Sequence, residues 1–158
     1  MSQGMALAAA WKRGKSMSEK NVAVRDPDAI RNILLDTKTV AVVGYSDDPG
    51  RAGHYVARYL QEAGYRVIPV NPSLKQGLGE TCYPSLKAIP EDIRIDMVDC
   101  FRRPEFIPDI ARDAAAIGAK VLWMQSGITS EQAREIATEA GMTVVENRCT
   151  MQEHRRLV

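Results

Sequence analysis

TVAVVGYSDDPGRAGHYVARYLQEAGYRVIPVNP, residues 39–72, contains two short apolar runs, the first mainly of β-branched residues, separated by a segment of mixed polarity. The runs at 39–44 and 65–72 are largely apolar, which is typical of parallel strands buried on both faces. Between them, residues 54–64 carry apolar side chains at helical spacing and end in glycine. This stretch therefore predicts a strand, a helix and a second strand in succession.

The same alternation continues along the chain. A helix is predicted within residues 25–38, where Asp26 is placed as the N-cap and Pro27 as the first helical residue. Further strands are predicted at 94–101, 120–125 and 142–146, with helices at 103–118 and 129–141, a helical turn at 148–158, and only short elements in the Gly- and Pro-containing segment 73–93. Because parallel strands need crossover connections, we expect one α/β domain with a Rossmann-like, doubly wound parallel sheet of about five strands.

Length and composition agree with one globular domain. The 158 residues are 45% hydrophobic and 26% charged, as in soluble proteins. A formal net charge of +1 gives no sign of a nucleic-acid surface, and no apolar run approaches the roughly 20 residues that cross a bilayer. We therefore expect neither nucleic acid nor membrane as a partner. A homodimer is left open.

The cysteines and the N-terminus bear on location. Cys82, Cys100 and Cys149 are odd in number and widely spaced, which argues against a disulfide framework and for a reducing compartment. The start, 1–24, lacks the features of a signal peptide, and we interpret it as a flexible leader before a domain over 25–158. We expect a cytoplasmic protein.

Candidate ligand-binding residues follow four predicted strands. They lie in GYSDDPGRAG (44–53), VNPSLK (70–75), CFRRPEF (100–106) and MQSGIT (124–129). In a doubly wound sheet, ligands bind beyond the carboxyl ends of the strands. These four segments are therefore expected to meet at one edge of the sheet.

The first of these loops has features of a phosphate site. Its spacing, G-x-S-x-x-x-G-x-x-G, is longer than the G-x-G-x-x-G fingerprint of dinucleotide-binding loops. Gly44 suits a sharp exit from the strand, Ser46 offers a hydroxyl, and Gly53 lies where a helix begins and its amides favour an anion. Arg51 could clamp a phosphate. The alternative is that the loop binds no phosphate: its glycines only shape a turn, and Arg51 is solvated.

The end of the second strand separates two ligand classes. NAD sites usually place a carboxylate there for the ribose hydroxyls, whereas this sequence has Val70, Asn71 and Pro72. Lys75 would suit NADP better, but the first loop fits either dinucleotide poorly. An NAD(P)-dependent oxidoreductase is therefore the alternative rather than the first hypothesis.

Several motifs together resemble a known family. Residues 40–72, 82–105, 118–128 and 146–157 are similar, in the same order, to the small bacterial and archaeal CoA-binding proteins. These resemble the CoA-binding domain of the succinyl-CoA synthetase alpha subunit. The resemblance implies a Rossmann-like fold and non-covalent binding of coenzyme A or an acyl-CoA, in a binding or regulatory module.

The resemblance also implies where CoA lies. Its phosphates are expected near the first loop, its adenosine near 70–75, its middle along 101–104 and its pantetheine near 125–128. Arginines and Lys75 would neutralise the phosphates, and apolar side chains would line the adenine and pantetheine. The candidate binding residues are Gly44, Tyr45, Ser46, Arg51, Gly53, Val70, Asn71, Pro72, Lys75, Phe101, Arg102, Arg103, Pro104, Gln125 and Gly127.

No catalytic or metal-binding residue is predicted. Synthetase chemistry depends on a phosphorylated histidine of a further domain, so we expect that activity to be absent. Cys149, Glu153 and His154 match no strong zinc pattern and are interpreted as structural. A CoA-linked thiol redox protein that acts through Cys149 remains a second alternative.

Overall fold

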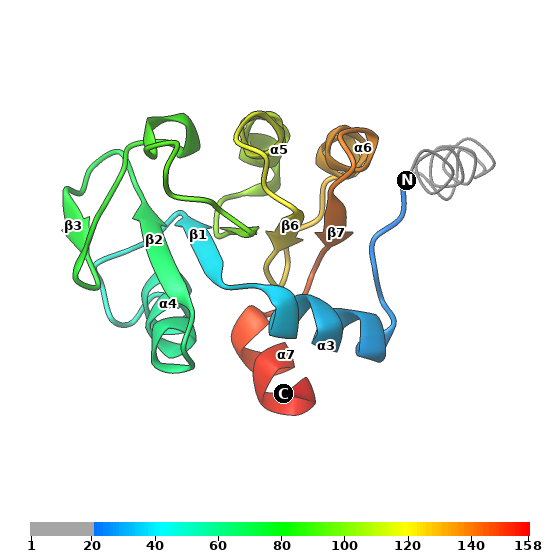
Figure 1. The fold of residues 1–158 in the computed structure, drawn as a ribbon, viewed down its shortest axis with the longest axis horizontal. Helices are drawn as coiled ribbons and strands as arrows, with labels where there is room; N and C mark the ends of the chain where they lie inside the picture. Colours follow the sequence, from blue (N-terminus) through cyan, green and yellow to red (C-terminus); the bar gives the residue numbers. More distant parts are fainter. Residues whose placement is uncertain (1–20) are drawn as a thin grey trace.

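The computed structural model describes residues 21–158 and contains a five-stranded parallel sheet (Figure 1). Its strands, in the spatial order β2-β1-β5-β6-β7, are β2 (Arg66–Val70), β1 (Thr39–Val43), β5 (Met97–Cys100), β6 (Val121–Met124) and β7 (Thr143–Val145). The chain moves outward from β1 in one direction to β2 and then in the other to β5, β6 and β7. The expected single α/β domain with about five parallel strands is confirmed.

Helices cover both faces of the sheet (Figure 1). One face carries α5 (Ile107–Ala116) and α6 (Glu131–Glu139), and the other carries α3 (Pro27–Asp36), α4 (Ala52–Glu62) and α7 (Thr150–Leu157). Short 3₁₀ turns, η1 (Leu86–Ala88) and η2 (Pro104–Phe106), precede β5 and α5. This three-layer arrangement leaves the carboxyl ends of the strands as the open edge where ligands bind in such folds.

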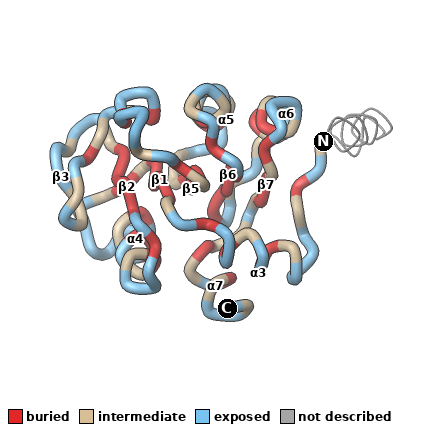
Figure 2. Tube along the Cα trace, in the orientation of Figure 1, coloured by how far each residue is buried: buried red, intermediate tan, exposed pale blue. Residues whose placement is uncertain are grey.

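The alternation of side chains along β1 divides the core into two layers. Ala41 and Val43 pack with the α5 and α6 layer, whereas Val40 and Val42 pack with the helices of the other face. All four are at most 7% exposed. Figure 2 shows the buried strands between largely exposed helix surfaces. A strand buried on both faces explains why the sequence of β1 is uniformly apolar.

The start of α3 follows the predicted chemistry, and α6 is capped in a similar way. The side chain of Asp26 accepts a hydrogen bond from the Ala29 amide at 3.0 Å, with Pro27 as the first residue of α3. In α6 the cap is Ser130, whose hydroxyl accepts from the amide of Ala133 at 3.1 Å. Both caps satisfy amides that a helix leaves without an internal partner.

Each edge of the sheet is covered by additional backbone. After β2, a short hairpin of β3 (Gln76–Gly77) and β4 (Glu80–Thr81) leads to Tyr83, which pairs with the end of β2. At the other edge, the Val24 amide donates to the carbonyl of Val144 at 2.7 Å. Such coverage limits the exposed strand edges that promote aggregation.

The leader predicted over 1–24 falls mostly outside the described residues. Its last four residues, 21–24, are described and contact the domain: Ala23 is buried, and the side chain of Asn21 accepts a hydrogen bond from Arg134 at 3.1 Å. Packing against the domain thus includes residues that precede the expected boundary at 25.

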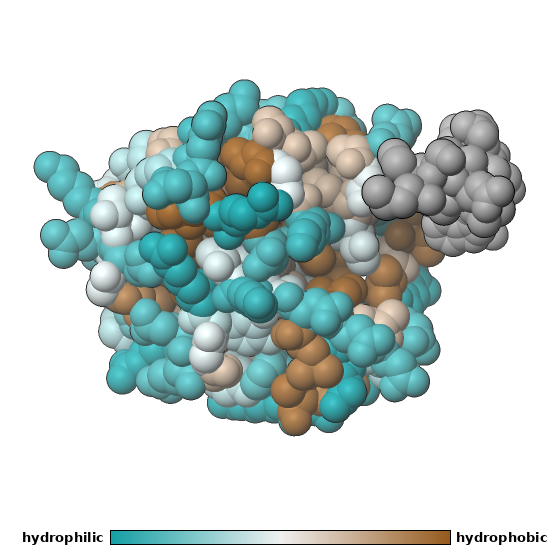
Figure 3. Space-filling model, viewed as in Figure 1, coloured by the Kyte–Doolittle hydropathy of each residue, from teal (hydrophilic) through white to brown (hydrophobic). Residues whose placement is uncertain are grey.

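The surface of the described residues is mixed in polarity. No helix among them is long and apolar enough to cross a bilayer, and no group of three or more metal-ligating side chains gathers there. On the face shown in Figure 3, hydrophilic residues cover most of the surface and hydrophobic residues form small separate groups. Scattered apolar residues of this kind are normal for protein surfaces.

Candidate functional site

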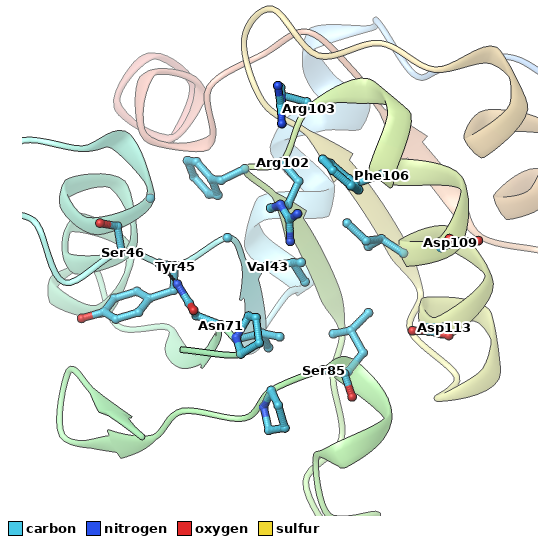
Figure 4. Close-up of a pocket in the computed structure, with 18 of the residues that line it drawn as sticks. Val43, Tyr45, Ser46, Asn71, Ser85, Arg102, Arg103, Phe106, Asp109 and Asp113 are labelled. Atoms are coloured by element: carbon cyan, nitrogen blue, oxygen red, sulfur yellow. Dashed lines mark hydrogen bonds between the residues drawn. The ribbon is translucent and has the colours of Figure 1, made fainter. Parts of the chain in front are cut away.

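A cleft of about 850 Å³ opens at the carboxyl ends of β1 and β5, where the strand order reverses (Figure 4). Ser46 and Tyr45 lie on one side of it, and Phe106 and Asp109 lie on the other. Arg102 projects between the two sides. The position is the one at which doubly wound sheets bind ligands, and the volume is within the range of small-molecule sites.

Two glycines allow the first loop to turn back on itself. Gly44 has φ +91°, and its amide and that of Tyr45 both donate to the carbonyl of Val70, at 3.1 and 3.3 Å. A Cβ at Gly44 would lie 2.8 Å from the carbonyl oxygen of Phe101. A Cβ at Gly53 would lie 2.4 Å from the carbonyl oxygen of Gly44. The loop therefore needs glycine at both positions, for close approach of backbone to backbone.

The N-terminus of α4 faces the cleft. Arg51 is its N-cap residue, and no side chain among residues 21–158 caps this end of the helix. The amides of His54 and Tyr55 donate to the Arg51 carbonyl, at 2.9 and 3.0 Å, which leaves the earlier amides of Ala52 and Gly53 beside the cleft. An uncapped helix start combines free donors with a positive dipole end, and both favour an anion.

Hydrogen bonds within the loop hold it against α4. The ring nitrogen Nδ1 of His54 lies 2.9 Å from the Ser46 carbonyl oxygen, and since a carbonyl only accepts, Nδ1 carries the proton. The Asp48 amide donates to Ser46 Oγ at 3.1 Å, and Asp48 Oδ1 accepts from the Gly50 amide at 2.9 Å. His54 is thus a support of the loop rather than a residue of the cleft lining.

Three arginines border the cleft. Arg51 is 75% exposed at its side chain and lies 3.8 Å from Asp48, a loose pair, whereas Arg103 pairs with Glu105 at 3.2 Å. Arg102 has no carboxylate partner among residues 21–158, and its guanidinium lies 4.3 Å from the ring centroid of Phe106. Stacking on an aromatic ring leaves the hydrogen-bond donors of a guanidinium available to a ligand.

The opposite part of the cleft is apolar with an acidic rim. Leu86 and Ile110 contribute apolar surface, and the Ser85 hydroxyl lies nearby. Asp109 pairs with Arg112 at 2.7 Å, and Asp113 pairs with Lys87 at 3.6 Å. Neighbouring cations partly neutralise these carboxylates, as Asp48 and Glu105 partly neutralise Arg51 and Arg103. Among the described residues that line the cleft, Arg102 is the arginine without a carboxylate partner.

The structure brings most of the predicted binding residues together. Those that line the cleft are Gly44, Tyr45, Ser46, Arg51, Gly53, Val70, Asn71, Pro72, Phe101, Arg102 and Arg103. Asn71 also braces the site, since its Nδ2 donates to the Tyr45 carbonyl at 2.7 Å.

Four predicted residues lie outside the cleft lining. Lys75 and Pro104 are exposed near it, and Gly127 donates its amide to the Asn147 side chain at 2.7 Å. Gln125 is only 5% exposed because its side chain enters a buried polar cluster. Lys75, in the segment after β2, is not among the residues that line the cleft.

Sequence reasoning missed the wall that η1 and α5 supply. The additional lining residues of this wall and of the residues next to it are Pro84, Ser85, Leu86, Phe106, Asp109, Ile110 and Asp113. Val43, at the end of β1, and Ala52, at the start of α4, also line the cleft. Those of the α5 region recur at spacings of three and four, so they share one face of a helix. The sequence shows this spacing, but it does not show which face of α5 lies along the cleft. That depends on how the helix packs on the sheet.

The buried cluster joins Asp99, Gln125 and Thr150. Asp99 Oδ1 accepts from Gln125 Nε2 at 2.6 Å, and Oδ2 accepts from the Thr150 hydroxyl at 2.9 Å. Burial of the carboxyl raises the pKa of Asp99 to about 7, although both hydrogen bonds lower it. These bonds link the ends of β5 and β6 to the start of α7.

Cys149 and His154 lie at the start of and within α7, and His154 joins this helix to α4. His154 Nδ1 lies 2.8 Å from the Tyr59 hydroxyl, and burial lowers the pKa of the histidine. Burial raises the pKa of Glu153, but hydrogen bonds from Arg156 and Arg148 outweigh it, so the pKa is lowered overall. Cys149 is the N-cap residue of α7 and is not in the cleft lining.

Comparison with known proteins gives the family. Residues 38–155 match the model of the CoA binding domain. The chain belongs to this family.

Its relatives include small proteins of similar length. It is 42% identical over 125 residues to the uncharacterized protein YneT of Bacillus subtilis, covering 79% of this chain and 91% of that protein. A hypothetical protein from Pyrococcus horikoshii has a similar structure, with a TM-score of 0.81 and 42% identity, covering 84% of this chain and 92% of that one.

The family also includes part of a larger enzyme. The chain is 29% identical over 124 residues to acetate–CoA ligase (ADP-forming) I of Archaeoglobus fulgidus. The match covers 73% of this chain but only 18% of the ligase. The chain is therefore homologous to the CoA-binding region of ADP-forming ligases, as the resemblance to succinyl-CoA synthetase implied.

Proposed function

We propose that this protein binds coenzyme A or an acyl-CoA non-covalently in the switch-point cleft, as a binding or regulatory module. The observation that carries the proposal is the uncapped start of α4 beside three arginines, at the carboxyl ends of β1 and β5, where the strand order reverses. CoA carries a pyrophosphate and a 3′-phosphate, and several cations near a helix start suit such a ligand.

The remainder of the cleft suits the rest of the molecule. An adenine ring and a pantetheine arm both need apolar contact with a few polar groups. Val70, Leu86 and Ile110 provide apolar surface, and Ser85 provides a hydroxyl. Family membership and the homology to CoA ligases support the same ligand class.

The dinucleotide alternative has less support. Both functional atoms of the Asn71 side chain are used within the protein, because Nδ2 donates to the Tyr45 carbonyl and Oδ1 accepts from the Ser73 amide. The end of β2 therefore presents no free acceptor pair to the ribose hydroxyls of NAD, which usually meet a carboxylate there.

Isothermal titration calorimetry tests the proposal. We expect CoA and acetyl-CoA to bind, with an affinity that falls as salt rises because phosphate contacts are screened, and NAD⁺ and NADP⁺ to give no heat. Native mass spectrometry of the freshly purified protein is the second test, since a retained ligand adds its own mass. Binding of NADH in the absence of any CoA signal would overturn the proposal.

A further inference from the structure

A second cavity, of about 530 Å³, lies between the segment that precedes β5 and the end of α5. Its apolar part consists mainly of four isoleucines, Ile89, Ile93, Ile95 and Ile117. Ile93 and Ile117 are only half-buried, so an apolar ligand in the cavity would remove further surface of both from water. Because the volume lies in the range of small-molecule sites, the cavity is able to hold an aliphatic group.

Charged side chains border this apolar part. They are Lys87, Arg94 and Glu91, so the lining carries one more positive than negative charge. Arg94 is exposed and forms no ion pair with any of residues 21–158. Lys87 Nζ lies 3.6 Å from Asp113 Oδ1, which is a loose pair. An excess of cations beside an apolar cavity is complementary to a ligand with an aliphatic body and an anionic head.

The second cavity and the cleft share one wall. On α5, Asp113 lines the cleft, whereas Ala116 and Ile117, three and four residues further along, line the second cavity. Residues at these spacings are neighbours on one face of a helix. In η1, likewise, Leu86 lines the cleft and Lys87 lines the second cavity. The ion pair of Lys87 with Asp113 therefore connects the linings of the two cavities.

We propose that the second cavity binds an aliphatic carboxylate, and that its occupation weakens the binding of CoA in the cleft. The aliphatic chain packs on the isoleucines, and the carboxylate pairs with Arg94 and Lys87. The site itself is independent of the ligand of the cleft. The effect on CoA rests on the proposed function.

The coupling follows from competition for Lys87. A carboxylate in the second cavity draws the Lys87 ammonium away from Asp113, because both anions are partners for the same cation. Asp113 then borders the cleft without its cation, and its negative charge repels a ligand that carries several phosphate charges. The coupling is reciprocal, so CoA lowers the affinity for the carboxylate by the same factor.

The exposure of the pair sets the size of the effect. The side chains of Lys87 and Asp113 are 66% and 33% exposed. Water and salt screen the interaction of such groups, and exposed ion pairs change an equilibrium by a factor of about two to five. We expect the carboxylate to weaken CoA binding by a factor in this range.

Nuclear magnetic resonance with octanoate tests the second site in the absence of CoA. The methyl signals of Ile93 and Ile117 are expected to shift and to saturate, whereas those of Ile30, buried on the other face of the sheet, should stay in place. Acetate should bind far more weakly than octanoate, because each buried methylene contributes about fourfold to affinity. Octan-1-ol, which has the same chain without the charge, should also bind more weakly.

Two variants test the head group. Arg94→Met should weaken octanoate binding about two- to fivefold and leave the melting temperature unchanged, because the side chain is exposed. Lys120→Met is the matched control: Lys120 pairs loosely with Asp96 at 3.9 Å, but it is not among the described residues that line either cavity. Equal effects of the two variants, or isoleucine signals that do not saturate, would overturn the site.

Calorimetry tests the coupling. Wild type should bind CoA about two- to fivefold more weakly in saturating sodium octanoate than in the same concentration of sodium chloride. In Asp113→Asn, octanoate should still shift the isoleucine signals but leave the affinity for CoA unchanged, because the amide has no charge to expose. Equal behaviour of the two proteins would overturn the coupling. Absence of CoA binding without octanoate would overturn the proposed function, and the isoleucine signals would still decide the second site.

Discussion

Gly53 packs so closely on Gly44 that a Cβ on Gly53 would lie 2.4 Å from the Gly44 carbonyl oxygen. This contact joins the start of α4 to the exit of β1, and it sets the position of the helix amides at the cleft. The longer loop of this protein thus retains the close helix–strand packing that glycine provides in dinucleotide-binding loops.

Gly53→Ala is therefore expected to disturb both stability and ligand binding. A methyl group forced against backbone should lower the free energy of unfolding by about 1–3 kcal/mol and weaken CoA binding, as measured by urea denaturation and calorimetry. Gly50→Ala is the matched control in the same loop, because its Cβ would meet only the Asp48 side chain, at 3.4 Å. Equal behaviour of the two variants would contradict the role given to Gly53.

The arginines of the cleft should affect affinity more than stability. Arg51→Ala and Arg102→Ala are each expected to weaken CoA binding by about 1.5–3 kcal/mol if they contact a phosphate, with little change in melting temperature because both side chains are accessible. Arg58→Ala, on the exposed side of α4 and paired with Glu62 at 3.2 Å, is the control. Unchanged affinity in both cleft variants would remove the phosphate site from this cleft.

Thr150→Val should destabilise the attachment of α7. The substitution keeps the shape of the side chain but removes a donor from the buried Asp99 carboxyl, and we expect a loss of about 1–3 kcal/mol in the free energy of unfolding. Thr150→Ser retains the hydroxyl and should recover most of this loss. Similar denaturation midpoints for Val and Ser at this position would show that the hydroxyl is dispensable.

Asp99 should make stability fall as pH rises. Its folded pKa is raised to about 7 by burial, whereas an unfolded aspartate titrates near 3.9. Between these values the folded state binds more protons, so the free energy of unfolding decreases with pH, by roughly 4 kcal/mol over the window. The contribution is fully present below about pH 4 and is lost above about pH 7.

Subtraction isolates this effect from other titrating groups. Glu153, whose pKa is lowered by its arginine partners despite burial, changes stability in the opposite direction at lower pH. Urea denaturation gives the free energy of unfolding of wild type and of Asp99→Asn at pH 5 and at pH 8. The wild-type value minus the Asp99→Asn value should be lower at pH 8 than at pH 5. A constant difference would mean that Asp99 does not titrate in this range.

Cys149→Ser is expected to leave CoA binding unchanged, because Cys149 lies at the N-cap position of α7 and is absent from the cleft lining. Incubation of the protein with oxidised CoA, followed by intact-mass analysis, checks the thiol hypothesis directly. A mixed disulfide that forms rapidly in wild type and is lost in Cys149→Ser would favour the redox alternative instead.

Local sequence determined the elements and their order. The apolar run of β1 and the helical spacing in α4 depend only on which neighbouring residues are buried, so periodicity was sufficient to predict them. Asp26 and Pro27 likewise marked the start of α3 through short-range hydrogen bonding. From this order, the right-handed crossovers of a parallel sheet placed the strand ends, and the residues that follow them, at one edge.

Tertiary packing decided which side chains reach the cleft. Gln125 follows a strand like Asn71 does, yet it turns into a buried cluster because Asp99 and Thr150, 26 and 25 residues away, provide its partners. Ile110 and Asp113 reach the cleft because α5 buries Ile107, Ala111 and Ala114, which leaves the neighbouring face of the helix along the cleft. Contacts between residues distant in the chain leave no local pattern, so composition and spacing fixed the scaffold while long-range packing selected the residues of the site.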